Sequence, residues 1–201
     1  MQILIPDSWL REYLQTDAKP KDIQKALSLC GPSVERMHKS GDDFIYDIEV
    51  TTNRVDMMSV YGIAREAAAI LPRFGHSAKL LSDPFASKLT FKTASDVNYL
   101  TMKADSILCL RSTAILIRNV DVKPSPDWVI KKLEAVGMRG LNNVIDISNL
   151  LMHELGQPVH TFDYDKIGKS TMTIRESRTG EVLTTLDNQK FSLPGHDIVI
   201  E

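Results

Sequence analysis

The sequence lacks long hydrophobic runs. None of its apolar stretches reaches the roughly 18 residues that a membrane-spanning helix needs. The first residues also lack the basic and then apolar pattern of a secretory signal peptide. We therefore expect no membrane span and no signal peptide, and we expect the protein to be cytoplasmic.

Cysteine is scarce as well. Cys30 stands at the end of a predicted helix and Cys109 in an apolar run, and the chain has only these 2 cysteines. This pattern is typical of buried, reduced thiols and argues against a disulfide framework or a cysteine zinc site. Histidine offers no compact ligand motif either, because His153 and His160 fall on different predicted elements. We therefore expect no metal site.

An excess of charge of one sign is also missing. The chain has 24 basic and 26 acidic residues and a net charge of -2. Without a basic surplus, any contact with RNA must be local or shared with a partner. What the sequence does have is 43% hydrophobic residues in a chain of 201, which is enough to bury the core of one large or two small domains.

The densest polar pattern lies between Gly137 and Asp163. It falls on an expected helix at residues 143–154 and an expected strand at residues 159–163. Gly137 and Gly156 frame the helix, each at a position where a left-handed backbone would end a helix. Nothing else in the chain crowds so many polar groups into elements that otherwise look buried.

Two stripes of side chains follow the helical period in this segment. The apolar stripe should pack on a core and consists of Val144, Ile147, Leu151 and Leu155. The polar stripe consists of Asn142, Asp146, Asn149 and His153. Because Asn and Asp are poor helix formers, this stripe is either a solvated face with an asparagine cap or the wall of a polar pocket. The strand expected next favours the pocket.

Around this stretch the sequence predicts an α+β fold. A small helix and hairpin domain is expected at residues 1–85, and a mixed α/β domain at residues 86–201, with the boundary in a polar segment that contains proline. The elements expected in the first domain are a strand at residues 2–6, a helix carrying Trp9, Leu10, Tyr13 and Leu14, a helix at 20–30, strands at 33–39 and 44–50, and a helix at 60–71.

The second domain should combine further strands with one more helix. Its expected elements are strands at residues 89–91 and 114–122, a helix that is capped by Ser125, buries Trp128 and ends at Val136, and strands at 171–176, 182–186, 191–193 and 198–200. No turn or cap follows the last apolar strand, so we expect the domain to be truncated at Glu201.

The central stretch resembles a known family. The residues that carry the resemblance are Arg139, Asn142, Asn143, Asp146, Asn149 and the run Glu154-Leu155-Gly156-Gln157-Pro158-x-His160-x-Phe162-Asp163. They are similar to the editing domain of the bacterial phenylalanyl-tRNA synthetase β subunit. The segment Thr51-Thr52-Asn53-Arg54-Val55-Asp56 also resembles the N-terminal domain of that subunit. The chain is thus identified as an N-terminal part of such a subunit, with the first part of the editing domain.

The resemblance implies an enzyme of translation. Phenylalanine-tRNA ligase charges tRNA-Phe with phenylalanine, using ATP and Mg²⁺, and the expected partners of this chain are the synthetase α subunit, in an α2β2 assembly, and tRNA-Phe. The editing domain hydrolyses mischarged Tyr-tRNA-Phe, and a polar pocket suits that task because tyrosine differs from phenylalanine by one hydroxyl. The OB-fold insertion usual in the family is replaced by four residues, 40–43.

The resemblance also implies roles for individual residues. His160 would orient or deprotonate the attacking water. Arg139 would hold the phosphate or ribose of the terminal adenosine. Asn149 would hydrogen-bond the ester or amino group, and Ser148 and Thr161 would lie beside these groups. This chain itself is expected to bind no cofactor, and it should be inactive alone because the family's tyrosine-reading glutamate comes later.

Two positions depart from the family, and two other functions stay open. Gly140 stands where the family has proline, and Thr161 where it usually has alanine. One alternative is a non-catalytic module that binds tRNA or the synthetase. The other is a free-standing ester hydrolase, which would need His160 within hydrogen-bond reach of Asp146 or Asp163.

Overall fold

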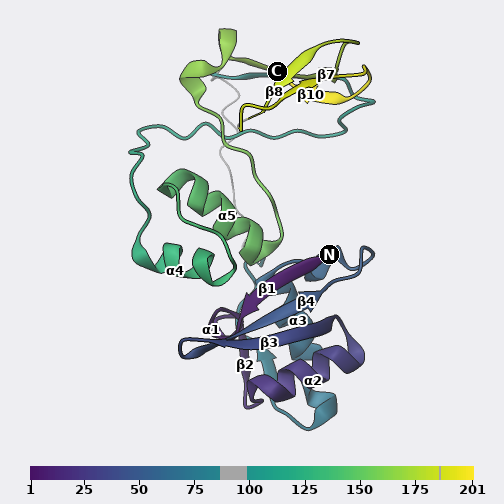
Figure 1. Ribbon diagram of the computed structural model, residues 1–201, viewed down its shortest axis with the longest axis vertical. Coiled ribbons are helices and arrows are strands. Elements are labelled where there is room, and N and C mark those ends of the chain that lie inside the picture. The colour runs from purple at the N-terminus through teal and green to yellow at the C-terminus, as the bar shows by residue number, and fades with distance from the viewer. Residues whose placement is uncertain (87–98, 186) are drawn as a thin grey trace. The chain divides into compact units, whose positions relative to one another are not determined.

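The computed structural model describes residues 1–86, 99–185 and 187–201. These residues form two compact units (Figure 1). The first unit combines residues 1–86 with residues 121–161, and the second combines residues 99–120 with residues 162–201. Helices occur together with several small sheets, so the predicted α+β class is confirmed. The domain boundary expected between residues 85 and 86 stays a prediction.

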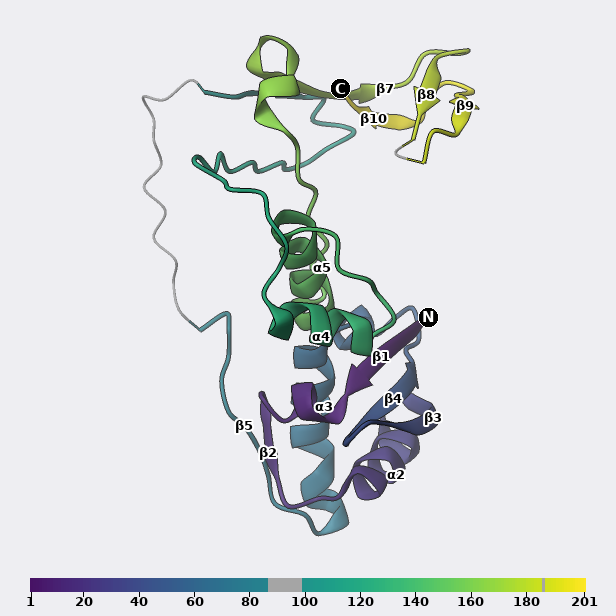
Figure 2. The ribbon, with the colours of Figure 1, turned by 60° about the vertical axis from the view of Figure 1, so that its left-hand side comes forward.

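A three-stranded antiparallel sheet with the order β1-β4-β3 runs through the first unit (Figure 2). Its strands are β1 (Gln2–Pro6), β3 (Ser33–Ser40) and β4 (Asp43–Glu49). Gly41 and Asp42 join β3 to β4 in the predicted hairpin. Residues 45–48 of the central strand β4 are buried, and α1 packs against this strand.

Three helices pack with this sheet: α1 (Asp7–Leu10), α2 (Pro20–Cys30) and α3 (Val60–Ile70). Pro20 occupies the first turn of α2 as predicted, and Ser59 caps α3 by accepting a hydrogen bond from the Gly62 N–H at 2.9 Å. Two 3₁₀ turns flank α3, η1 (Val55–Met57) and η2 (Leu71–Phe74).

The first helix is shorter than predicted. It ends at Leu10, and Leu14 belongs instead to β2 (Leu14–Thr16), which pairs with β5 (Ala78–Leu80). The backbone of residues 14–16 thus takes its hydrogen bonds from a strand more than sixty residues later, which helical spacing could not indicate.

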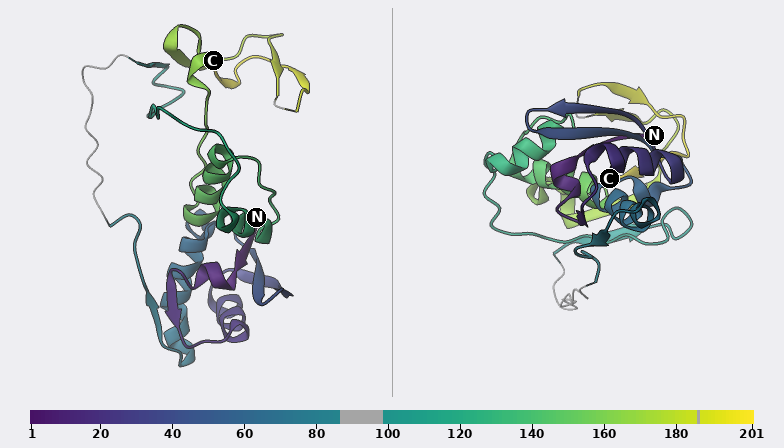
Figure 3. Two further views of the ribbon diagram at one scale, coloured as in Figure 1. Left: turned by 90° about the vertical axis from the view of Figure 1, so that its left-hand side faces the viewer. Right: turned by 90° about the horizontal axis from the view of Figure 1, so that it is seen from below.

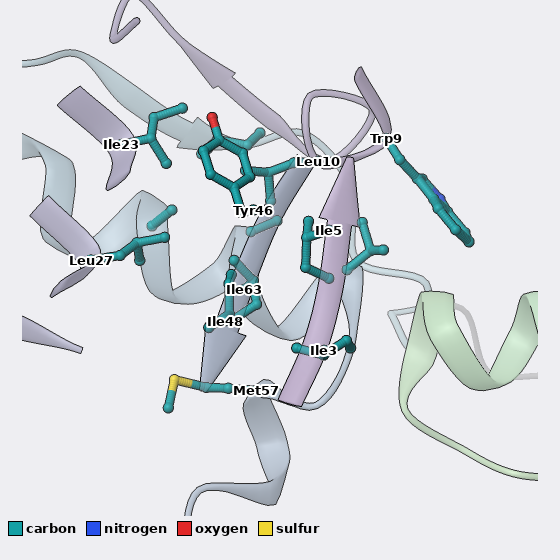
Figure 4. Close-up of a cluster of buried hydrophobic side chains, with 14 of the residues drawn as sticks. Ile3, Ile5, Trp9, Leu10, Ile23, Leu27, Tyr46, Ile48, Met57 and Ile63 are labelled. Carbon is teal, nitrogen blue, oxygen red and sulfur yellow. The ribbon is translucent and has the colours of Figure 1, made fainter. Parts of the chain in front are cut away.

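The core of the first unit is mostly apolar and includes a buried polar pair, Tyr46 and Asp7. Figure 4 shows the clustered side chains, among them Ile5, Leu10 and Ile48, and the Tyr46 ring. The Tyr46 hydroxyl donates a 2.6 Å hydrogen bond to the carboxylate of Asp7. Burial and this hydrogen bond raise the pKa of Tyr46 far above its ordinary value. The hydroxyl therefore remains a donor, and its partner is satisfied.

The remaining helices of the first unit are α4 (Asp127–Ala135) and α5 (Asn143–Leu155), which lie side by side (Figure 3). Helix α4 also packs against β1, and α5 packs against α3. Both helices were predicted, but Ser125 does not cap α4 and Trp128 is 56% exposed. The Ser125 hydroxyl is committed to a side chain of α5 instead.

The second unit is built from short strands. Parallel β6 (Thr101–Ala104) and antiparallel β10 (Ile198–Ile200) flank β7 (Thr171–Glu176), while β8 (Val182–Thr184) and β9 (Lys190–Ser192) form a hairpin. Two 3₁₀ turns, η3 (Tyr164–Lys166) and η4 (Gly168–Ser170), precede β7. The four strands predicted after residue 170 are thus confirmed within a few residues of each end, and residue 186 lies outside the described residues.

Other expectations for strands and cysteines are wrong. Residues 114–122 are an irregular segment, and so are residues 159–163. Neither segment finds a pairing strand among the described residues, and a strand needs such a partner to satisfy its backbone. Cys30 is exposed and Cys109 half-buried, so Cys30 is not a buried thiol. The strand expected at residues 89–91 lies outside the described residues.

Candidate functional site

Helix α5 begins and ends as the sequence predicts. The side-chain oxygen of Asn142 accepts hydrogen bonds from the N–H groups of Val144 and Ile145, both at 3.1 Å. This asparagine cap satisfies donors that every helix leaves unpaired at its start. At the other end Gly156 has a φ of 77°, the left-handed conformation expected of a glycine cap.

The side of α5 that faces the protein carries one polar and one apolar buried residue, Asp146 and Leu150. Asp146 is 1% exposed, whereas Ile147 is 51% exposed and Leu151 36%. The prediction that the apolar stripe packs on a core is therefore wrong for Ile147 and Leu151, whereas Val144 and Leu155 are half-buried. The interpretation of the polar stripe as a solvated face is wrong for Asp146 too, since its carboxylate is buried with hydrogen-bond partners of its own.

Asp146 fixes the loop that carries Arg139. One carboxylate oxygen of Asp146 accepts a hydrogen bond from the Ser125 hydroxyl at 2.6 Å, and the other accepts one from the Leu141 N–H at 2.8 Å. The carboxylate thereby ties the segment before α4 and the loop before α5 to one helix. Gly140 fits beside it closely, because an added Cβ would lie 3.4 Å from a carboxylate oxygen of Asp146.

Asn143 holds a second segment against the start of α5. Its side-chain NH₂ donates to the Asp121 carbonyl at 2.9 Å, and its side-chain oxygen accepts from the Lys123 N–H at 3.1 Å. The Asn143 N–H also donates to the Lys123 carbonyl at 2.8 Å. The neighbouring asparagines of the motif therefore have separate structural tasks, capping by Asn142 and anchoring by Asn143.

His153 stands near the other end of the polar stripe. Its Nε2 lies 3.2 Å from the Met138 sulfur. Its Nδ1 is buried and has no hydrogen-bond partner among the described residues. Burial lowers the pKa of this imidazole below its ordinary value. The ring is therefore held in its neutral form at neutral pH.

The structure places the predicted site residues as follows. Arg139, His160 and Thr161 are exposed, and Ser148 and Asn149 are half-buried on α5. The Ser148 hydroxyl donates to the Ile145 carbonyl at 2.7 Å within the helix. No hydrogen bond joins Arg139, Ser148 and Asn149 to one another within the described part of the chain. The assignment of these residues to one site stays a prediction.

The carboxylates proposed as partners of His160 in a free-standing hydrolase have other partners. Both oxygens of Asp146 accept hydrogen bonds in the α4–α5 region. Asp163 caps η3 by accepting a hydrogen bond from the Asp165 N–H at 3.2 Å, and it lies 3.5 Å from the Lys166 ammonium. These contacts favour structural roles for both residues.

Two features of this unit were not apparent in the sequence. The first is a network of charges around α3. Arg54 and Asp56 form an ion pair at 2.9 Å. Arg54 also binds Glu66 at 2.8 Å, and Arg65 binds Asp56 at 2.9 Å. Hydrogen bonds from Arg54 and Arg65 lower the pKa of Asp56. Arg65 and Asp56 are exposed and Arg54 and Glu66 are only half-buried, so water screens these ion pairs and we expect a small effect on stability.

The second feature concerns Glu154 of the Glu-Leu-Gly-Gln-Pro run. One oxygen of its carboxylate accepts hydrogen bonds from the Tyr13 hydroxyl at 2.8 Å and the Trp9 indole N–H at 3.3 Å. Both donors lie more than 140 residues earlier in the chain. Only a signal of long-range pairing could have revealed this contact, and one sequence contains no such signal.

Comparison with known proteins gives consistent matches. Residues 108–201 match a protein-family model described as the B3/4 domain. A phenylalanine-tRNA ligase β subunit from Geobacter sulfurreducens is 40% identical over 162 residues, which cover 79% of this chain and 19% of the relative. The chain is a relative of phenylalanine-tRNA ligase β subunits. The resemblance drawn from the sequence is thereby confirmed.

Further β subunits of phenylalanine-tRNA ligase match at similar levels. The one from Dehalococcoides mccartyi strain ATCC BAA-2266 is 43% identical over 151 residues, covering 75% of this chain and 18% of the relative. The one from Rhodopirellula baltica is 32% identical over 198 residues, covering 98% of this chain and 28% of the relative. The chain thus spans about a fifth to a quarter of the length of these relatives.

Among residues 1–86, 99–185 and 187–201, no group of three or more His, Cys, Asp and Glu side chains is arranged to hold a metal ion. Within the same ranges, every helix is too short or too polar to cross a membrane.

Proposed function

We propose that this chain is part of a phenylalanine-tRNA ligase and belongs to the region that hydrolyses mischarged Tyr-tRNA-Phe. The observation that carries the proposal is the 32–43% identity to β subunits over most of the chain, with the B3/4 match covering the segment that bears the motif. The whole enzyme would join phenylalanine to tRNA-Phe with ATP and Mg²⁺, in the cytoplasm. Its α subunit would be the partner of this chain in an α2β2 assembly.

Within this proposal His160 acts on the water that attacks the ester. Its exposed imidazole follows α5 after a short irregular segment, and an imidazole is the side chain best suited to take a proton near neutral pH. Asn149 would hydrogen-bond the ester or the amino group from the half-buried face of α5. Since it makes no side-chain hydrogen bond to the described residues, its amide has donors and an acceptor to offer a substrate.

Arg139 would bind the phosphate or ribose of the terminal adenosine. Its guanidinium is exposed on a loop whose backbone Asp146 holds in place, and a planar guanidinium suits forked contacts to phosphate. Ser148 and Thr161 would line the same pocket. We propose no hydrolysis by the 201-residue chain alone, because it spans only about a fifth of the relatives.

The test uses a β subunit that contains this sequence, assembled with its α subunit. We expect His160→Ala to slow deacylation of Tyr-tRNA-Phe on the order of 100-fold, the usual contribution of a general base. Charging with phenylalanine should be unchanged. His38→Ala is the matched control, because His38 is an exposed histidine on β3, far along the chain from the motif. Deacylation by His160→Ala at the wild-type rate would remove His160 from the mechanism.

A further inference from the structure

The carboxylate of Glu154 joins the end of α5 to the first helix of the chain. Tyr13 and Trp9 both donate to the same oxygen of Glu154, at 2.8 and 3.3 Å. Trp9 is 1% exposed, and in Figure 4 its ring points away from Tyr46 and Ile23. Burial and the hydrogen bond to Glu154 raise the pKa of Tyr13, so its hydroxyl stays protonated and donates. A half-buried carboxylate that accepts from two donors forms a directional contact.

A second contact holds the same end of α5. At Gly156 an added Cβ would lie 3.2 Å from the Met58 carbonyl oxygen and 3.4 Å from the Cβ of Ser59. Ser59 is the cap of α3, so Gly156 lies directly on the start of that helix. The left-handed turn that ends α5 is therefore packed on one side and has little freedom to shift.

A side chain of helix α4 also contacts Trp9. Lys132 forms an ion pair with Glu12 at 2.6 Å, and its ammonium lies 4.7 Å from the centre of the Trp9 ring. The side chain of Lys132 is 19% exposed and that of Glu12 50%, so water screens the ion pair more than it screens the contact of the ammonium with the buried Trp9 ring. Trp9 is thus held between the carboxylate of α5 and the cation of α4.

These contacts assign a role to the Glu-Leu-Gly part of the motif. Glu154 and Gly156 contact the protein's own N-terminal segments, and the segment with His160 leaves α5 at Gly156. We propose that Glu154 is a positioning residue: by binding Tyr13 and Trp9 it fixes the end of α5 from which His160 is presented for deacylation. The inference rests on the proposed function. Through this contact the N-terminal region would hold the editing site in position.

The chemistry of the contact allows a graded set of variants. Glu154→Gln keeps a side-chain oxygen that accepts from both donors, whereas Glu154→Ala removes the acceptor. Tyr13→Phe removes one donor and leaves the packing of the ring. Trp9 is unsuitable for substitution because its loss would also empty part of the core.

The first measurement tests the contact itself in the 201-residue chain. The chain has 2 tryptophans, so its NMR spectrum has two indole N–H signals. Glu154→Ala should shift the Trp9 signal and speed its exchange with water at least about 10-fold, the consequence of losing a shielded hydrogen bond. Trp128, which is 56% exposed, gives the reference signal that should stay in place. An unmoved Trp9 signal would overturn the proposal.

The second measurement tests positioning in the assembled ligase. Glu154→Ala should lower kcat for deacylation of Tyr-tRNA-Phe about 10- to 100-fold, with KM changed less than about 3-fold, because a small displacement of a catalytic group costs rate more than binding. Tyr13→Phe should give a smaller loss of kcat, and Glu154→Gln should restore at least half of the wild-type value. Each rate is divided by the concentration of assembled enzyme, so that a loss of folded protein does not lower the measured kcat.

The outcomes separate this inference from the proposed function. If His160→Ala slows deacylation but Glu154→Ala and Tyr13→Phe leave kcat unchanged, Glu154 does not position His160 and the inference is wrong. A rise in KM with kcat unchanged would also overturn it. If His160→Ala has no effect either, the proposed function itself is wrong.

Discussion

The hydroxyl of Ser125 donates a 2.6 Å hydrogen bond to the buried carboxylate of Asp146. Ser125→Ala leaves that carboxylate with one donor fewer in a site without water access, which should lower the free energy of unfolding by about 1–3 kcal/mol. Denaturant unfolding measures the change. Ser8→Ala is the matched control: Ser8 makes a similar bond to Asp43 at 2.5 Å, but on the surface, and its loss should cost less than about 0.5 kcal/mol. Equal costs would contradict the assignment of Asp146 as a buried anchor.

His153 should make the protein sensitive to mild acid. Burial lowers the pKa of this imidazole from its ordinary value of 6.5, so the unfolded chain binds its proton more readily than the folded chain does. The free energy of unfolding therefore falls as the pH drops below about 6.5, because the unfolded state takes up the proton first. Denaturant unfolding at a series of pH values between 7 and 5 should show a steeper decline for wild type than for His153→Leu.

Leu150→Ala is the control for that experiment. It removes a side chain from the buried face of α5, where Leu150 is 8% exposed, and so lowers stability without removing a titratable group. It should keep the wild-type dependence on pH. If His153→Leu declines as steeply as wild type, the buried imidazole does not control this dependence.

Glu181 should stabilise the second unit down to strongly acid pH. Hydrogen bonds from Arg175 and from the Arg178 N–H lower the pKa of Glu181 from 4.5 to about 2. The contribution of a carboxylate with a lowered pKa is complete above its ordinary value and disappears as the pH falls through the lowered one. Wild type should therefore be more stable than Glu181→Gln at pH 6, and the difference should shrink between pH 4.5 and 2. Circular dichroism during thermal unfolding at each pH measures the stability of wild type and of Glu181→Gln. A constant difference would exclude this ion pair as its source.

Three glycines should respond differently to alanine. Gly62→Ala should destabilise most, by roughly 3 kcal/mol or more, because the new Cβ would lie 2.1 Å from the Asp56 carbonyl oxygen and backbone must move. Gly156→Ala combines a φ of 77° with a 3.2 Å contact. Gly75→Ala has a φ of 83° but nothing within 4 Å, so it isolates the backbone cost of about 1–2 kcal/mol. The reverse order in thermal unfolding would contradict these packing distances.

Local signals in the sequence predicted much of the fold. Pro20 placed the start of α2, Asn142 and Gly156 marked the ends of α5, and the apolar run of residues 198–200 predicted β10. These signals act within a few residues, because a cap or a fixed φ depends on the nearest backbone groups. Elements with such signals were predicted nearly to the residue.

Features that depend on distant partners were missed. Local spacing predicted a helix at Leu14. Its actual partner in β5, Leu80, comes 66 residues later, where local spacing gives no sign of it. The sequence left Asp146 open between a solvated face and a pocket wall, and the serine that makes its burial favourable lies 21 residues earlier. The candidate site was predicted by resemblance alone, since periodicity contains no information on which side chains meet. Glu154 was part of the motif, yet its contact with Tyr13 required a structure.

The apolar side of α5 matters for the behaviour of this chain in solution. Ile147 and Leu151 stand in water on one helix face. Salts that are excluded from protein surfaces strengthen the burial of such groups, so sulfate should drive copies of the chain together through this face. Ile147→Lys should therefore raise the concentration of ammonium sulfate at which the protein precipitates. An unchanged precipitation point would mean that this face plays no part in solubility.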